Sequence, residues 1–176
     1  QKEVDEKKDE LLENCKVTAA TATQTYLKPK QFQMYDLVVI DESSMLPLPL
    51  IGYVSGLSKD KVTVAGDFKQ LPPIIISRGN RVKEEQRDII DNWLGIDVFT
   101  KAGIASAVEK NKPPVNLVKL RVQYRMEKDI CNLINNRFYY GDLITHDSAG
   151  ATKGSYPDFF CNPLILIDTR DFTPFC

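Results

Sequence analysis

Two adjacent acidic residues stand at the end of an aliphatic run and could perform metal-dependent chemistry. Asp41 and Glu42 follow directly after the four residues Leu37-Val38-Val39-Ile40. Neighbouring residues of an extended chain point in different directions, so the two carboxylates can serve different partners. One can hold Mg²⁺, usually through water, while the other acts as a base on a water that attacks a phosphate. The alternative interpretation is a strand end with a solvated acidic turn.

A second candidate segment is Gly66-Asp67-Phe68-Lys69-Gln70-Leu71-Pro72-Pro73, which follows another short β-type run. Glycine allows the chain to turn at the tip of a strand, and two prolines stiffen the chain that follows. The amide of Gln70 offers both a donor and an acceptor, so it could report the presence of a γ-phosphate. A pattern this long seldom arises by coincidence, and it favours a nucleotide site over a plain loop.

The third candidate segment is Gln123-Tyr124-Arg125-Met126. Arg125 carries a planar, permanently charged guanidinium that suits phosphate oxygens. An intramolecular salt bridge at a helix start is the alternative for this arginine. Tyrosines between a strand and a helix, such as Tyr124, are often core residues, and Gln123 is expected to be structural.

In this order, the three segments resemble motifs II, III and IV of superfamily 1 helicases. The likeness extends over residues 18–168 and is greatest to the 1B group, which includes the nonsense-mediated-decay RNA helicase and the replication helicase-nuclease. It implies an ATP-dependent helicase or translocase that uses ATP and Mg²⁺ and moves on single-stranded nucleic acid, with DNA slightly favoured over RNA.

The resemblance also implies a role for each site residue. Asp41 would bind Mg²⁺, Glu42 would be the general base, and Gln70 would couple the γ-phosphate to the nucleic-acid side. Arg125 would be an arginine finger, which is worth about 10³ to 10⁵ in rate in other nucleotide hydrolases. Tyr124 would pack against adenine, and Asp67 is expected at the same cofactor site.

Two further segments are candidates for contact with nucleic acid. Thr21 and Thr23 lie where family members touch the nucleic-acid backbone, and their hydroxyls could bind phosphates without reading sequence. Turn formation is the alternative for these threonines. The segment Phe138-Tyr139-Tyr140-Gly141-Asp142-Leu143 resembles a family segment that follows motif IV. We expect it to pack at a helix end, with base stacking as the alternative.

The elements that must position these residues are those of an α/β fold. We expect β-type runs at residues 17–21, 37–40 and 62–65, with a crossover at residues 47–55. The run at 37–40 has no polar alternation, which predicts a parallel strand covered by helices on both faces. Ligands of such sheets bind beyond the carboxyl ends of the strands, where Asp41, Glu42 and residues 67–70 lie. The resemblance implies a RecA-like P-loop NTPase fold, a parallel sheet flanked by helices.

Two prolines within residues 110–114 break every regular pattern and suggest a domain boundary. Residues 1–112 would be the C-terminal part of a first RecA-like domain, and residues 113–176 the beginning of a second. We expect helices at residues 1–14, 102–108 and 127–140, strands at 115–122 and 163–168, and at 77–91 a mobile loop that runs into a helix.

The 176 residues contain no G-x-x-x-x-G-K-[ST] phosphate loop. The first domain is therefore expected to be incomplete, and the remainder of a parent chain would supply the phosphate loop and later motifs. The chain alone is expected to be inactive. Two alternatives stay open: a catalytically degenerate nucleic-acid-binding scaffold, and a nucleic-acid-dependent ATPase without strand separation.

Composition is that of an ordinary α/β domain, with 43% hydrophobic and 27% charged residues. The net charge of −1 does not indicate a nucleic-acid binder, although a cleft can be basic in a neutral chain. Four scattered cysteines form no C-x-x-C pair, and His146 has no Cys or His at ligand spacing, so it is expected to be a surface residue. A charged start and the lack of a long apolar stretch predict a cytoplasmic protein, or a nuclear one in a eukaryote.

Overall fold

The computed structural model of the chain describes residues 7, 10–11, 14–75 and 83–150. The chain forms two compact units, residues 1–115 and 116–176, so that the division follows the paired prolines 113 and 114. Among the described residues, no helix is both long and apolar enough to cross a membrane.

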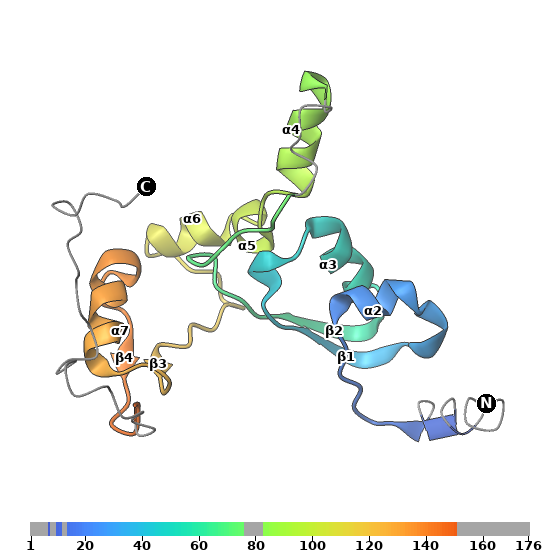
Figure 1. The fold of residues 1–176 in the computed structure, drawn as a ribbon, viewed down its shortest axis with the longest axis horizontal. Coiled ribbons are helices and arrows are strands. Elements are labelled where there is room, and N and C mark those ends of the chain that lie inside the picture. The colour runs from blue at the N-terminus through green and yellow to red at the C-terminus, as the bar shows by residue number, and fades with distance from the viewer. Residues whose placement is uncertain (1–6, 8–9, 12–13, 76–82, 151–176) are drawn as a thin grey trace, which may run out of the picture. The chain divides into compact units, whose positions relative to one another are not determined.

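The first unit is built around two parallel strands that lie side by side (Figure 1). β1 (Tyr35–Ile40) pairs with β2 (Ser58–Val64), and α3 (Leu48–Ser55) is the crossover between them. These elements confirm the predicted strands at residues 37–40 and 62–65 and the predicted crossover at 47–55. The register places Ile40 opposite Val64, so both strands end at the same edge.

One face of this small sheet is covered. Ile40, Ile51 and Val54 form the buried core, with α2 (Ala22–Leu27) contributing Ala22 at its margin. On the opposite face, the side chains of Leu37 and Val39 are 52% and 60% exposed. The expected cover on both faces is therefore wrong for the described residues, because α2 and α3 lie against one face alone (Figure 1).

The run at residues 17–21 is not a strand. It is irregular, and Val17 is 81% exposed, because no strand of the described residues lies beside it to complete a ladder. Thr21 instead caps α2, and its hydroxyl accepts a long hydrogen bond of 3.4 Å from the Gln24 N–H. The short 3₁₀ turn η1 (Pro29–Gln31) leads from α2 to β1.

Three helices complete the first unit: α4 (Glu84–Trp93), α5 (Val98–Lys101) and α6 (Ile104–Glu109). The helix expected to follow the loop in residues 77–91 is α4, whereas residues 76–82 lie outside the described part of the chain. The helix predicted at 102–108 begins two residues later than expected as α6, after Gly103 turns the chain with a φ of 74°. At the N-terminus, residues 7, 10, 11 and 14 are helical, and the rest of the predicted helix lies outside the described residues.

The second unit contains two very short parallel strands, β3 (Val122–Gln123) and β4 (Ile144–Thr145). The predicted strand at 115–122 is wrong except for its last residue, since Val115, Val118 and Leu120 are exposed and have no neighbouring strand among the described residues. The predicted helix at 127–140 is confirmed as α7 (Lys128–Ile134) followed by a π-helical turn, η3 (Asn135–Tyr139). The predicted strand at 163–168 lies outside the described residues.

Candidate active site

The loops that follow β1 and β2 interlock at the carboxyl edge of the sheet. The backbone N–H and the hydroxyl of Ser43 both donate to the carbonyl of Ala65, at 2.9 and 2.6 Å. The N–H of Ala65 donates in turn to the carbonyl of Ile40, at 2.8 Å. Ser43 and Ser44 are fully buried although they follow two exposed acids, so they anchor the first loop beneath its acidic tip.

The two loops approach each other closely at Gly66. A Cβ atom at this position would lie 2.9 Å from the hydroxyl oxygen of Ser43 and 3.0 Å from both the Ser44 backbone nitrogen and the Phe99 ring. These distances are too short for any side chain, so the glycine is required for close packing. The two predicted motifs therefore fold as one structural unit.

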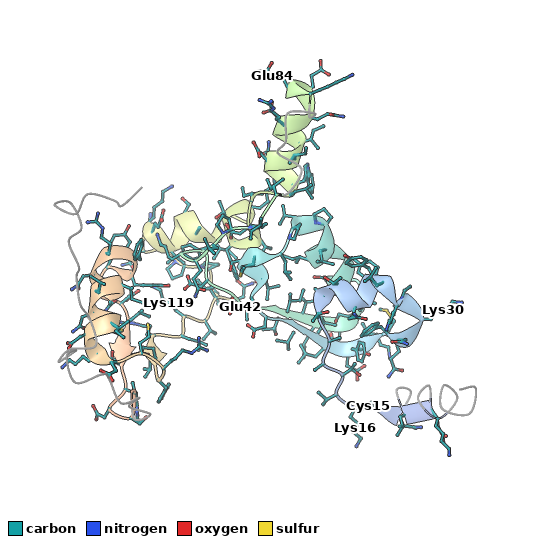
Figure 2. All side chains as sticks on the ribbon, in the orientation of Figure 1. Cys15, Lys16, Lys30, Glu42, Glu84 and Lys119 are labelled. Carbon is teal, nitrogen blue, oxygen red and sulfur yellow. The ribbon has the colours of Figure 1, made fainter. Side chains whose placement is uncertain are left out.

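Asp41 and Glu42 stand exposed at the tip of the first loop, with Glu42 at the end of β1 (Figure 2). The Asp41 carboxylate accepts a hydrogen bond of 2.9 Å from the N–H of Glu42. Glu42 has a φ of 51° and a ψ of 34°, a left-handed conformation that is uncommon for residues other than glycine. Such a conformation persists only where the surroundings impose it, and here the 3₁₀ turn η2 (Ser43–Met45), whose first two residues are buried, follows directly.

Asp67 organises the second loop. One carboxylate oxygen accepts from the Lys69 N–H at 2.9 Å, and the other accepts from the side-chain amide of Gln70 at 3.0 Å. The backbone N–H of Gln70 donates to the carbonyl of Asp67, also at 3.0 Å. Lys69 extends to α6, where its ammonium lies 2.7 Å from a carboxylate oxygen of Glu109. The orientation of Gln70 is therefore set by Asp67 in this structure.

The donor set at this edge fits Mg²⁺ only as part of a larger complex. No group of three or more His, Cys, Asp or Glu side chains that could hold a metal occurs among the described residues. Mg²⁺ in nucleotide sites, however, is held by one or two carboxylates together with waters and phosphate oxygens. The exposed carboxylate of Asp41 would meet that requirement together with waters and phosphate oxygens.

In the second unit, the side chain of Gln123 holds the turn that bears Tyr124 and Arg125. Its carbonyl oxygen accepts from the N–H groups of Arg125 and Met126, at 2.9 and 2.7 Å. Its amide donates to the carbonyl of Met126 at 2.9 Å and to the Thr145 hydroxyl at 3.1 Å. Three of these hydrogen bonds hold the turn and the fourth ties it to β4, as expected for a structural residue.

Both functional candidates on this turn face solvent. Arg125 is exposed and forms no ion pair with the described residues, so the alternative of a salt bridge at the helix start is not observed. Tyr124 is 60% exposed, which excludes the alternative of a core residue. Its ring contacts that of His146, with centroids 4.5 Å apart and planes inclined by 33°.

His146 is exposed, as predicted, but its contact with Tyr124 was missed from the sequence. The pairing of β3 with β4 places Gln123 opposite Thr145, so that the next residues on each strand meet. No local spacing could indicate this contact, because it depends on the register between two distant two-residue strands.

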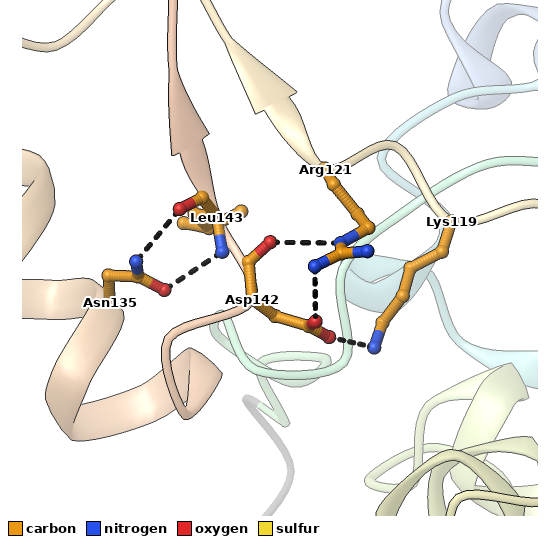
Figure 3. Close-up of polar contacts among 5 residues, drawn as sticks. All are labelled: Lys119, Arg121, Asn135, Asp142 and Leu143. Carbon is orange, nitrogen blue, oxygen red and sulfur yellow. Dashed lines mark hydrogen bonds and ion pairs between the residues drawn. The ribbon is translucent and has the colours of Figure 1, made fainter.

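The segment that ends the π-helical turn is held by polar contacts, shown in Figure 3. The side chain of Asn135 exchanges two hydrogen bonds of 2.9 Å with the backbone of Leu143. Asp142 binds Lys119 and also Arg121, whose guanidinium lies 3.2 Å from its carboxylate. The hydrogen bond from Lys119 is the main reason that the pKa of Asp142 lies below its ordinary value, although burial opposes the shift.

The aromatic residues of this segment pack less than expected. Tyr139 is half-buried, while Phe138 and Tyr140 are largely exposed, so the predicted packing at the helix end holds for one ring of the three. Tyr140 and Gly141 both adopt left-handed conformations that end the helix.

The structure thus places the predicted site residues in three locations. Asp41, Glu42, Asp67 and Gln70 share the carboxyl edge of the first sheet. Thr21 and Thr23 lie at the start of α2 in the same unit, both exposed. Tyr124 and Arg125 belong to the second unit.

Comparison with known proteins identifies an AAA domain family that matches residues 103–173. The chain is 34% identical over 155 residues to the DNA polymerase alpha-associated DNA helicase A of Saccharomyces cerevisiae, which covers 85% of this chain and 19% of that protein. It is 27% identical over 132 residues to the DNA replication ATP-dependent helicase/nuclease dna2 of Schizosaccharomyces pombe, covering 75% and 8%.

A third relative is the DNA-binding protein SMUBP-2 of Rattus norvegicus, which is 29% identical over 157 residues, or 86% of this chain and 14% of that protein. The chain therefore spans between 8% and 19% of the length of these three curated relatives.

Proposed function

Since the chain belongs to the superfamily 1 helicases, we propose that it is part of a longer ATP-dependent DNA or RNA helicase and carries that enzyme's hydrolytic carboxylates and arginine finger. Residues 1–112 are the C-terminal part of its first RecA-like domain, and residues 113–176 begin its second. The phosphate loop belongs to the remainder of the longer protein.

The observation that carries the proposal is the interlocking of the two loops at Gly66. Parallel strands bind their ligands beyond their carboxyl ends. The hydrogen bonds from Ser43 to the Ala65 carbonyl, next to the close approach at Gly66, hold the acidic loop and the Gln70 loop together at that edge. A metal ligand, a base and a γ-phosphate sensor are needed together at such a site, and these loops offer a residue for each role.

Asp41 and Glu42 have different roles at the phosphate. Asp41 holds Mg²⁺, which neutralises charge on the phosphate oxygens when MgATP is bound. Glu42 accepts a proton from the attacking water onto its carboxylate, at a position where the backbone is left-handed. The exposure of both carboxylates leaves them accessible to a nucleotide.

Gln70 is the group that couples the γ-phosphate to the nucleic-acid side. The hydrogen bond from its amide to Asp67 keeps it at the edge before nucleotide binds. A phosphate oxygen competes with the Asp67 carboxylate for that amide, so nucleotide binding changes the contacts of the Gln70 loop. Asp67 belongs to the cofactor site through this exchange.

Arg125 supplies the positive charge that stabilises the transition state. Its exposed guanidinium has no ion pair with the described residues that must be broken before it contacts phosphate oxygens. The backbone on either side of it is fixed by Gln123, which limits the freedom lost on binding. Tyr124, on the same turn, packs against adenine.

The substrate is single-stranded nucleic acid, with DNA slightly favoured over RNA. The three relatives described above are named as a DNA helicase, a DNA replication helicase/nuclease and a DNA-binding protein, which supports DNA. Thr21 and Thr23 contact the strand's phosphates, and the exposure of both residues at the start of α2 supports this role. The proposal includes a cytoplasmic or nuclear location.

The test is ATP hydrolysis by the complete protein with single-stranded DNA, with RNA of the same sequence, and with neither. We expect a single strand to raise the rate of ATP hydrolysis. If Arg125 acts as an arginine finger, Arg125→Lys should lower that rate by at least about 10³-fold. Arg87→Lys, on the exposed face of α4, is the matched control. Absence of stimulation would favour the scaffold alternative, and stimulation without strand separation would favour the simple ATPase.

A further inference from the structure

One face of the Tyr124 ring is already occupied. The His146 ring lies against it at 4.5 Å between centroids, with an inclination of 33° that is closer to stacking than to an edge-to-face contact. The side chain of Tyr124 nevertheless remains 60% exposed. The ring is therefore supported from one side and open to solvent elsewhere.

His146 is itself held at several points. Its backbone N–H donates to the carbonyl of Gln123 at 3.0 Å, and its carbonyl accepts from the Ala149 N–H at 2.9 Å. Its ring nitrogen Nδ1 accepts from the Ser148 N–H at 3.2 Å and lies 2.9 Å from the Ser148 hydroxyl. Strand pairing and the following turn together fix the position of the imidazole ring.

Tyr124 has no comparable support from its own turn. The side chain of Gln123 holds the backbone of Arg125 and Met126, but none of its hydrogen bonds reaches the Tyr124 side chain. An exposed tyrosine can rotate about two side-chain bonds, and ordering the ring on binding costs conformational entropy. A ring that is to stack on a base binds more tightly when it is ordered beforehand.

We propose that His146 is a positioning residue for Tyr124, which stacks against one ring face and leaves the other face for the nucleotide base. The bound state is then a stack of three rings: imidazole, phenol and base. This inference rests on the proposed role of Tyr124 in nucleotide binding and adds to it the residue that sets the ring's orientation.

The first test uses the chain without nucleotide. Proton NMR of the Tyr124 ring should show a shift caused by the adjacent imidazole, which is lost in His146→Ala and largely retained in His146→Phe. Unchanged Tyr124 signals in His146→Ala would overturn the inference.

The second test uses the complete protein and compares ATP with inorganic tripolyphosphate, which has no base. We expect His146→Ala to raise the KM for ATP roughly 2- to 12-fold, the range for an aromatic pair, with kcat and the inhibition constant of tripolyphosphate unchanged. His146→Phe should restore the KM. A rise in both the KM for ATP and the inhibition constant of tripolyphosphate, or no rise in the KM for ATP, would overturn the inference.

Tyr124→Ala separates this inference from the proposed function. If Tyr124→Ala leaves the KM for ATP unchanged, the proposed adenine role is wrong and the inference falls with it. If Tyr124→Ala raises the KM, the role stands, and His146→Ala should then add nothing in the Tyr124→Ala background. A full additional effect would show that His146 acts independently of Tyr124 and would contradict the inference alone.

Discussion

Gly66 and Glu42, at the carboxyl edge of the first sheet, are constrained in different ways. Gly66 is required by space, since three groups of the neighbouring loop and α5 leave no room for a side chain. Glu42 is held in a left-handed conformation despite its side chain, at a cost of the order of 1–3 kcal/mol. A backbone strained at an exposed acid is consistent with a position selected for chemistry, and the burial of Ser43 and Ser44 provides the compensating anchor.

The glycine at position 66 should not tolerate a methyl group. Gly66→Ala places Cβ within 3.0 Å of Ser43, Ser44 and Phe99, so we expect a loss of about 1–3 kcal/mol in the free energy of unfolding. Gly52→Ala is the matched control, because nothing lies within 4 Å of a Cβ at that exposed position in α3. It should stabilise the helix by up to about 1 kcal/mol. Equal denaturation midpoints for the two variants would disprove the close approach.

At the scale of elements, the sequence predicted correctly those strands and helices that depend on residues close together in the chain. The aliphatic run at 37–40 and the run at 62–65 were correctly predicted as strands. The acids and the glycine that follow them were correctly predicted to lie at the carboxyl edge of one sheet. The run at 115–122 also contains several aliphatic residues, but it is not a strand before residue 122, because a strand exists only where a partner lies beside it. The sequence shows neither the partner nor its register, which is also why the contact between Tyr124 and His146 was missed.

The link between η3 and β4 depends on Asn135. Replacing Asn135 by alanine leaves the N–H and the carbonyl of Leu143 without the partners they have in the structure, and we expect a loss of about 1–3 kcal/mol. The neighbouring Asn136 is exposed, and Asn136→Ala should change stability by less than about 0.5 kcal/mol. Hydrogen exchange at the Leu143 amide measures the effect directly. Unchanged protection of that amide in Asn135→Ala would refute this role.

The ion pairs of Asp142 should make the second unit sensitive to acid. The pKa of Asp142 is lower in the folded state than its ordinary value of 3.8. The contribution of Asp142 to stability is therefore complete above the unfolded-state pKa and is lost as the pH falls through the lower folded-state pKa. Since the carboxylate is 34% exposed, the effect should stay within the range of about 0.2–1 kcal/mol typical of surface pairs.

Asp142→Asn removes this acid-dependent part, and unfolding measured between pH 7 and pH 3 detects it. Asp147→Asn, which changes an exposed carboxylate in the loop after β4, is the control of equal charge. The stability of the Asp142 variant should fall less on acidification than that of the control. Parallel curves would show that Asp142 contributes nothing to the acid sensitivity.

At the scale of the whole molecule, the groups proposed to act on one nucleotide are divided between two units. The carboxylates and Gln70 lie in the first, while Arg125 and Tyr124 lie in the second. No phosphate loop occurs in the sequence to complete the cradle. We therefore expect the isolated 176-residue chain to bind nucleotide weakly and to show no MgATP turnover above background. Steady-state hydrolysis by the chain that disappears in Glu42→Gln would contradict this expectation.

The central claim, that Glu42 is the base of a strand-activated ATPase, is tested most directly by one rate. Single-turnover ATP hydrolysis by the complete protein, bound to single-stranded nucleic acid, should slow by about 10²- to 10⁴-fold in Glu42→Gln. Glu85→Gln, an exposed residue of α4, should keep the rate of the unmodified protein. If Glu42→Gln hydrolyses ATP as fast as the Glu85→Gln control, the assignment of the base is wrong.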